Sequence, residues 1–168
     1  MKHLFCTLLC LVGFWSIGQA QFADEVNVLD IKVGATKTVK GDLSSGTFKD
    51  LRFGNSVGCF SDAEKSFFNG NHVIYGFKVP ANTKVLVEIN AADHTSLYGY
   101  MLDASTYTIP PYLEKVSKSG CSASHNGAGA VDRIMMKAGS TPMNVVVGVT
   151  GVNEAAGGSF TLKVVTRQ

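Results

Sequence analysis

The sequence is poor in proline, tryptophan and charge. Its 168 residues include 4 Pro and 1 Trp, and only 17% are charged. The 15 basic and 13 acidic residues are spread along the chain, so no basic block provides the surface that nucleic acids or anionic membranes require. The hydrophobic content of 45% excludes a disordered chain. The 18 Gly and frequent Val argue against a coiled coil or a helical bundle, and the length suits one domain.

The first 20 residues have the features of an export signal. Lys2 is followed by an apolar run from Leu4 to Ile17, and Gly18-Gln19-Ala20 supplies small residues at the two positions that a signal peptidase reads. The alternative is an uncleaved anchor, but the run is shorter than the ~20 residues of a spanning helix. We therefore expect residues 1–20 to be a cleaved signal peptide and residues 21–168 to form one exported domain, in the periplasm, on the cell surface or secreted.

Two of the four cysteines remain after this cleavage, Cys59 and Cys121. Export places both thiols in an oxidising compartment, which favours a disulfide between them. The alternative is two separate buried thiols. Two cysteines alone cannot form a tetrahedral zinc site, and no pair of histidines lies nearby at ligand spacing.

The remaining sequence reads as short strands punctuated by glycine and other turn residues. Apolar and polar residues alternate most clearly in the segments 72–79 and 84–90. We expect Val85, Val87 and Ile89 to point inward and these two segments to pair as a hairpin. Residues 43–68 read as a long connection with one or two short elements, and Gly120–Gly129 as a loop. Strands are expected at 26–28, 31–33, 37–40, 72–79, 84–90, 97–102, 131–136, 143–149 and 159–165. Such a pattern predicts an antiparallel sandwich or barrel.

Several of these segments resemble one bacterial family. Tyr75-x-Phe77-x-Val79-Pro80-Ala81-Asn82 is similar to the "Y-x-F-x-V-P-A" strand and turn of pre-peptidase C-terminal domains. Four further segments resemble motifs of the same family in the same order: Leu29–Gly34, Leu97–Leu102, Asn144–Val149 and Gly157–Val164. The resemblance spans residues 26–166 and implies a jelly-roll-like β-sandwich, here standing alone. It implies no catalysis, and some relatives bind calcium or an extracellular polymer such as collagen.

Catalytic motifs are missing from the sequence. It contains no H-E-x-x-H and no G-x-S-x-G, and Asp93-His94 with Ser96 cannot form a triad through sequence adjacency alone. Ser122 and Ser124 shortly precede His125 in what reads as a solvated loop. We therefore expect no enzyme. Four carboxylates could share a calcium ion or lie in solvated turns: Asp62, Glu64, Asp93 and Asp103.

Tyrosines provide the candidate contact residues. Tyr98 and Tyr100 fall on one face of a strand and are either an exposed binding surface or core. A second group lies in an expected surface loop: Tyr107, Pro110, Pro111 and Tyr112. The sequence therefore predicts a non-catalytic binding or structural module, an accessory subunit of an envelope or cell-surface assembly or an adhesin-like protein. Its partner would be an envelope protein or a matrix polymer. The alternative is a calcium-dependent or carbohydrate- or matrix-binding module.

Overall fold

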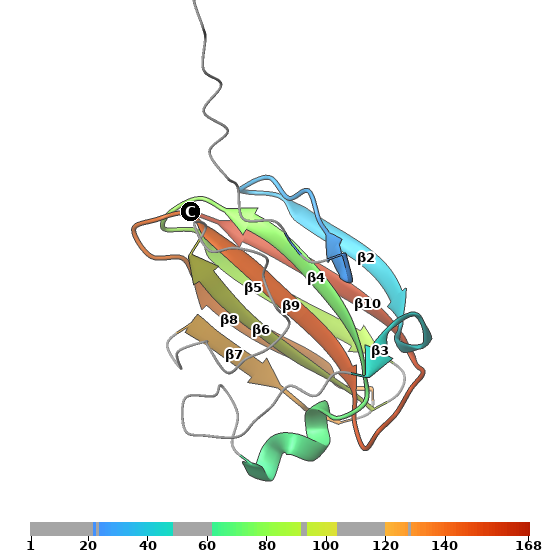
Figure 1. Cartoon of the computed structure of the whole chain (residues 1–168). Coiled ribbons are helices and arrows are strands. Elements are labelled where there is room, and N and C mark those ends of the chain that lie inside the picture. Colours follow the sequence, from blue (N-terminus) through green and yellow to red (C-terminus); the bar gives the residue numbers. More distant parts are fainter. Residues whose placement is uncertain (1–21, 23, 49–61, 92–93, 104–119, 128) are drawn as a thin grey trace, which may run out of the picture.

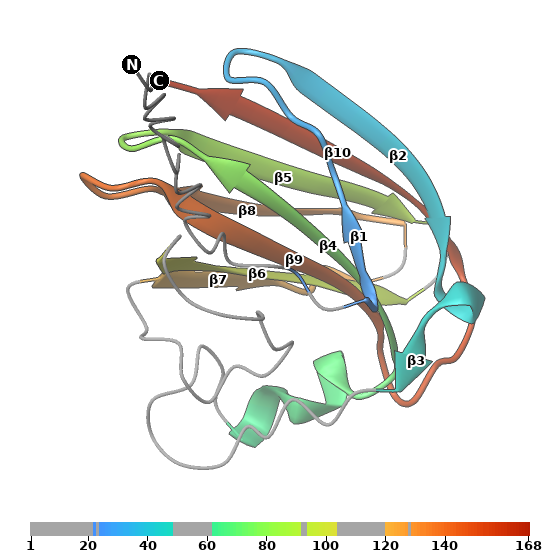
Figure 2. The same cartoon turned by 45° about the horizontal axis from the view of Figure 1, so that its top comes forward.

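The chain folds into two β-sheets packed face to face. The computed structural model describes residues 22, 24–48, 62–91, 94–103, 120–127 and 129–168. One sheet has the strand order β1-β4-β9-β6-β7, with β3 also paired to β4, and the other has the order β2-β10-β5-β8. Figures 1 and 2 show the two layers. The strands are β1 (Val26–Val28), β2 (Thr36–Asp42), β3 (Thr47–Phe48), β4 (Asn71–Val79), β5 (Lys84–Ala91), β6 (Thr95–Asp103), β7 (Cys121–Ser124), β8 (Val131–Lys137), β9 (Met143–Gly151) and β10 (Ser159–Arg167).

The connectivity is that of a jelly roll. Apart from β6 and β7, which pair with each other, successive long strands from β2 onward alternate between the two sheets. The resulting orders β2-β10-β5-β8 and β4-β9-β6-β7 interleave the beginning and the end of the chain, as two Greek keys do. The expected all-β sandwich is thus confirmed, and the barrel alternative is excluded because the two sheets do not close.

The core lies between the sheets and follows the alternation of the strands. Val85, Val87 and Ile89 point inward, as the sequence predicted, and are at most 1% exposed. The outward positions of β5 and β10 between these core residues are half-buried or exposed. In β9 the side chains alternate between the two faces of a sheet that is covered on both sides. This double burial explains the unbroken apolar run in its sequence.

A second, smaller cluster covers the outer face of the six-stranded sheet. The 3-10 helix η2 (Asp62–Phe68) lies there (Figure 2) and contributes Phe68 to the cluster. Phe22 packs in the same cluster, and the 3-10 helix η1 (Leu43–Ser45) joins β2 to β3. Tyr98 lies flat over Gly148, the cross-strand neighbour where any Cβ would overlap the tyrosine ring. The buried members of this cluster are Phe22, Val26, Phe68, Ile74, Tyr98, Tyr100 and Val146.

The expected hairpin between the segments at 72–79 and 84–90 is wrong. β4 pairs with β1, β3 and β9, whereas β5 pairs with β10 and β8 in the opposite sheet. Both strands send alternate side chains into the same core, so alternation alone cannot distinguish a pair within a sheet from a pair across the sandwich. The Pro80–Thr83 connection, in which Asn82 adopts a φ of 60°, carries the chain from one sheet to the other.

Three further expectations are corrected by the backbone. The segment expected to be a loop at Gly120–Gly129 contains strand β7, which pairs with β6 through small residues. No strand forms at residues 31–33, because β1 ends at Val28. The sheets are not wholly antiparallel, since β1 pairs with β4 in parallel. Among the described residues, no helix has the length and apolarity needed to cross a membrane.

Candidate functional site

The tyrosine pair of β6 belongs to the interior. Tyr98 and Tyr100 both have 0% exposure and pack in the cluster beneath η2. Of the two readings of this pair, the structure therefore shows core, and the contact surface proposed for it is incorrect. Burial raises the pKa of both phenols, so each keeps its proton at physiological pH.

A buried polar network explains why a tyrosine occupies position 98. Its hydroxyl lies 3.1 Å from Nδ1 of His72, and Nε2 of His72 lies 3.1 Å from the Phe68 carbonyl oxygen. Because a carbonyl only accepts, the histidine proton belongs on Nε2, and the Tyr98 hydroxyl donates to Nδ1. Thr150 Oγ1 lies 3.2 Å from the same Nε2. The network links β4, β6, β9 and η2 through hydrogen bonds, so its role is to stabilise the fold.

Serine, histidine and aspartate meet at the start of β8, yet they do not form a catalytic set. Ser124 Oγ donates to Asp132 at 2.7 Å, and the Asn126 backbone N–H donates to the same carboxylate at 2.8 Å. The His125 ring instead stacks on Phe67 with a centroid distance of 4.0 Å, and its buried Nδ1 has no hydrogen-bond partner among the described residues. Within the described ranges, the hydroxyl of Ser124 contacts the Asp132 carboxylate and the Asn126 side chain but no histidine nitrogen, so these residues lack a Ser-His-Asp relay and instead close the β7–β8 connection.

The other predicted site residues are scattered or lie outside the described residues. Tyr107, Pro110, Pro111, Tyr112, Asp93 and Cys59 lie outside them. Glu64 lies in η2 and the exposed Asp103 ends β6, while Asp62 begins η2. Within the described ranges, no group of three or more His, Cys, Asp or Glu residues could hold a metal ion. Cys121 is disulfide-bonded, and its pairing with Cys59 stays a prediction.

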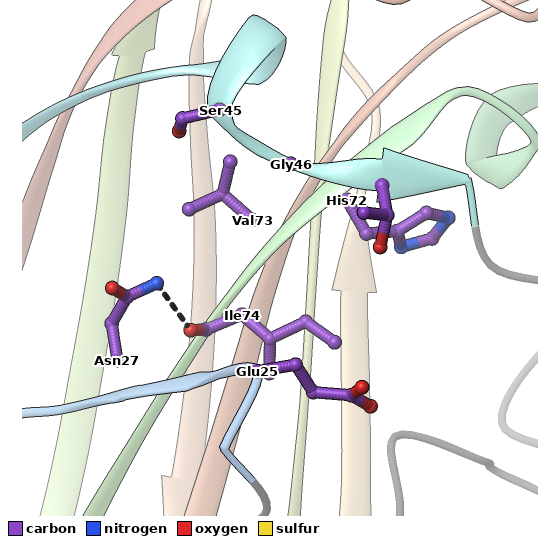
Figure 3. Close-up of a pocket in the computed structure, with 8 residues that line it drawn as sticks. Glu25, Asn27, Ser45, Gly46, His72, Val73 and Ile74 are labelled. Carbon is purple, nitrogen blue, oxygen red and sulfur yellow. Dashed lines mark hydrogen bonds between the residues drawn. The ribbon is translucent and has the colours of Figure 1, made fainter.

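A shallow pocket of about 200 Å³ lies along the edge of β4, between β1 and β3. Figure 3 shows Asn27, Ser45 and Glu25 around it. Asn27 donates its side-chain N–H to the Ile74 carbonyl at 3.0 Å, and Ser45 Oγ donates to the Asp42 carbonyl at 2.7 Å. These hydrogen bonds serve the fold, because they fasten β1 and η1 to neighbouring backbone.

The outer face of the four-stranded sheet carries an exposed apolar row. Leu86, Met135 and Val165 are cross-strand neighbours, with Leu86 opposite both of the others. Met135 is 70% exposed, whereas Leu86 and Val165 are half-buried. Together with Lys84 and Arg167 they line a notch of about 130 Å³. A contiguous apolar patch rimmed by polar groups is a feature of interaction surfaces, whereas single exposed apolar side chains are ordinary.

One side of the apolar row is electrostatically satisfied. Glu88 accepts from Lys163 Nζ at 3.1 Å and from Arg133 Nε at 2.7 Å. These two bonds, with the Lys163 bond contributing most, lower the pKa of Glu88. The three residues are directly opposite one another across β10, β5 and β8. In this ionic row the Glu88 carboxylate compensates part of the positive charge of Lys163 and Arg133.

The other side of the apolar row carries three cations. Lys84 of β5 lies directly opposite Arg167 of β10 and Lys137 of β8. Like charges in opposite positions destabilise a sheet. In the part of the chain that the structure describes, none of the three forms an ion pair. This cationic row therefore leaves uncompensated positive charge beside an aliphatic notch.

Sequence reasoning predicted the inward residues of β5 but did not identify Leu86 as an outward apolar residue. The alternation of the sequence could have revealed this residue, because Leu86 occupies an outward position of a strand whose inward positions are Val85, Val87 and Ile89. The exposed Met135 likewise alternates with the buried Ile134 and Met136. What the sequence could not supply is the neighbour, since β5, β8 and β10 come together only through the sheet order.

Comparison with known proteins yields likeness to solved structures alone. No family model matches the chain, and no curated protein matches it. The pre-peptidase C-terminal domain of a collagenase from Bacillus anthracis is similar with a TM-score of 0.46 and 12% identity, over 84% of this chain and 96% of that one. PliG of Aeromonas hydrophila, a periplasmic inhibitor of g-type lysozyme, is similar with a TM-score of 0.45 and 9% identity, over 86% of this chain and 99% of that one.

Proposed function

We propose that this protein is an exported, non-catalytic binding module that contacts a protein partner through the outer face of its four-stranded sheet. The observation that carries the proposal is the apolar row of Leu86, Met135 and Val165. It lies on a face whose other outward positions on the same three strands are mostly polar or charged. Covering this row with a partner would remove apolar surface from water, which favours association.

The rigidity of the scaffold supports this role. All three residues belong to regular strands, and the packed core beneath these strands holds their backbone in place. A partner that binds there meets a preformed surface, so little ordering entropy is lost on association. An accessory subunit of an envelope assembly or an adhesin-like protein would use such a surface. The loop at Tyr107–Tyr112 stays a second predicted contact element.

Site-directed photocrosslinking in the native host tests the proposal. A photoreactive amino acid at position 135 should yield an adduct larger than the protein by the mass of a partner, because this is the most exposed position of the apolar row. The matched control places the same residue at Val28, which is 66% exposed and lies in the other sheet. Equal crosslinking from both positions, or none from position 135, would contradict the proposed face.

A further inference from the structure

The cationic row specifies the chemistry of the partner. We propose that the outer face recognises an acidic protein segment that inserts one aliphatic side chain into the notch and places carboxylates over Lys84, Lys137 and Arg167. This inference rests on the proposed function and adds to it the charge and shape of the partner.

The notch sets the size of the inserted group. Its volume of about 130 Å³ is bounded by the Leu86, Met135 and Val165 side chains and by Lys84 and Arg167. This space is on the scale of one branched aliphatic side chain. The methionine thioether at its rim is unbranched and adaptable, so it can close over such a side chain. The stems of the long cationic residues extend the apolar wall while their charged ends stay in water.

The positions of the charges set the polarity of the segment. On one side of the notch Glu88 already neutralises part of the charge of Lys163 and Arg133. On the other side the three residues of the cationic row form no ion pair within the described part of the chain. A partner carboxylate at this end relieves the repulsion between Lys84 and its two cross-strand neighbours. A basic partner would increase this repulsion, so the row selects against it.

A peptide titration followed by NMR tests the inference on the full chain as exported. The probe is a synthetic peptide with leucine between pairs of aspartates. Two comparison peptides replace the aspartates with lysines or the leucine with serine. At millimolar concentration the acidic leucine peptide should shift the amide signals of Leu86, Met135 and Val165, and both comparison peptides should shift them much less. Added salt should weaken the binding, because the charges are exposed.

Charge removal provides the matched variants. The triple variant Lys84→Ala, Lys137→Ala and Arg167→Ala should lose roughly tenfold in affinity for the acidic peptide, the summed effect of three exposed ion pairs. Its thermal stability at low salt should be retained or raised, because mutual repulsion is removed. The control variant replaces Lys32, Lys40 and Lys78 with alanine and leaves Lys37 on the edge of β2 in place. These exposed lysines carry the same total charge but do not line the notch, and their loss should leave affinity within about twofold.

The outcomes separate this inference from the proposed function. Equal or stronger shifts with the lysine peptide, or no shift with the acidic peptide, would overturn the acidic partner. If the acidic peptide fails in this way but position 135 still yields a crosslinked partner, the proposed binding face would stand and only the acidic character of the partner would be wrong. Unchanged affinity in the triple alanine variant would likewise remove the cationic row from the recognition surface.

Discussion

Single residues determine how the outer face of the six-stranded sheet is filled. Tyr98 reaches His72 on β4 only because Gly148, on the intervening strand β9, has no side chain. The glycine leaves space for the ring, and the hydrogen bond satisfies a buried histidine nitrogen. An unsatisfied polar group at such a site costs about 1–3 kcal/mol. Burial of the tyrosine is therefore coupled to the identity of a residue 50 positions away in the sequence.

Gly148→Ala should destabilise the protein by about 1–3 kcal/mol, because the added methyl group overlaps the Tyr98 ring and forces the core to adjust. Chemical denaturation measures the change. Gly157→Ala is the control, since a Cβ there meets no atom within 4 Å. A loss of stability equal to that of the control would show that Tyr98 moves away without cost.

Asp42 gives the fold a specific response to acid. It caps the 3-10 helix η1 by accepting from the Ser44 backbone N–H at 2.9 Å, and it also accepts from Ser159 Oγ at 2.9 Å. The hydrogen bonds to Ser44, followed by that to Ser159, lower the pKa of Asp42 from 3.8 to about 2. The carboxylate joins the end of β2 to the start of β10, so its protonation weakens one edge of the four-stranded sheet.

The stabilisation from Asp42 should be complete above its unfolded pKa and should be lost as pH falls from about 4 toward 2. The reason is that the unfolded chain, with the higher pKa, binds the proton first. Urea denaturation at several pH values measures this loss. Asp42→Asn keeps an oxygen acceptor but has no charge to titrate, so the contribution of this site to the acid slope should disappear. An identical slope in wild type and variant would refute this assignment.

At the scale of the elements, the free edge of β2 needs protection against pairing with another chain. Among the described strands, β2 pairs only with β10, and Val39 and Gly41 face the core. By the same alternation Lys37 faces inward, yet it is exposed at the rim of the sandwich. An inward-pointing lysine on an edge strand obstructs the addition of a further strand.

Lys37→Val should therefore promote self-association without unfolding the domain. Light scattering during gentle heating measures this change, and circular dichroism checks the fold. The control is Lys40→Val, which makes the same exchange on the outward side of β2 and leaves the inward charge in place. If both variants aggregated equally, general hydrophobicity rather than the position of Lys37 would be responsible.

At the scale of the whole molecule, export and a disulfide would together stabilise the sandwich. Cys121 is disulfide-bonded and lies on β7, beside Tyr100 of the buried outer cluster. Pairing with Cys59, as predicted from the sequence, would attach the segment that precedes η2 to the far edge of the six-stranded sheet. Closing a loop of this length contributes about 4 kcal/mol in the chain-entropy model.

The mass of the non-reduced exported protein should correspond to a chain that starts at Gln21 and lacks two thiol hydrogens. Reduction should lower its melting temperature, because the unfolded chain regains conformational freedom. Cys59→Ser and Cys121→Ser should each reproduce this decrease and should not add when combined. Two free thiols in the wild-type protein would contradict the predicted bridge, and a start at Met1 would contradict the cleavage.

The sequence by itself determined the all-β class, the inward residues of β5 and most strand positions, because side-chain alternation is a local property of a strand. Only the tertiary structure decided that β4 and β5 face each other across the core, that Tyr98 and Tyr100 are buried, and that Leu86 joins Met135 and Val165 in one row. These features depend on which distant strands become neighbours, and alternation within one strand contains no information about its neighbour.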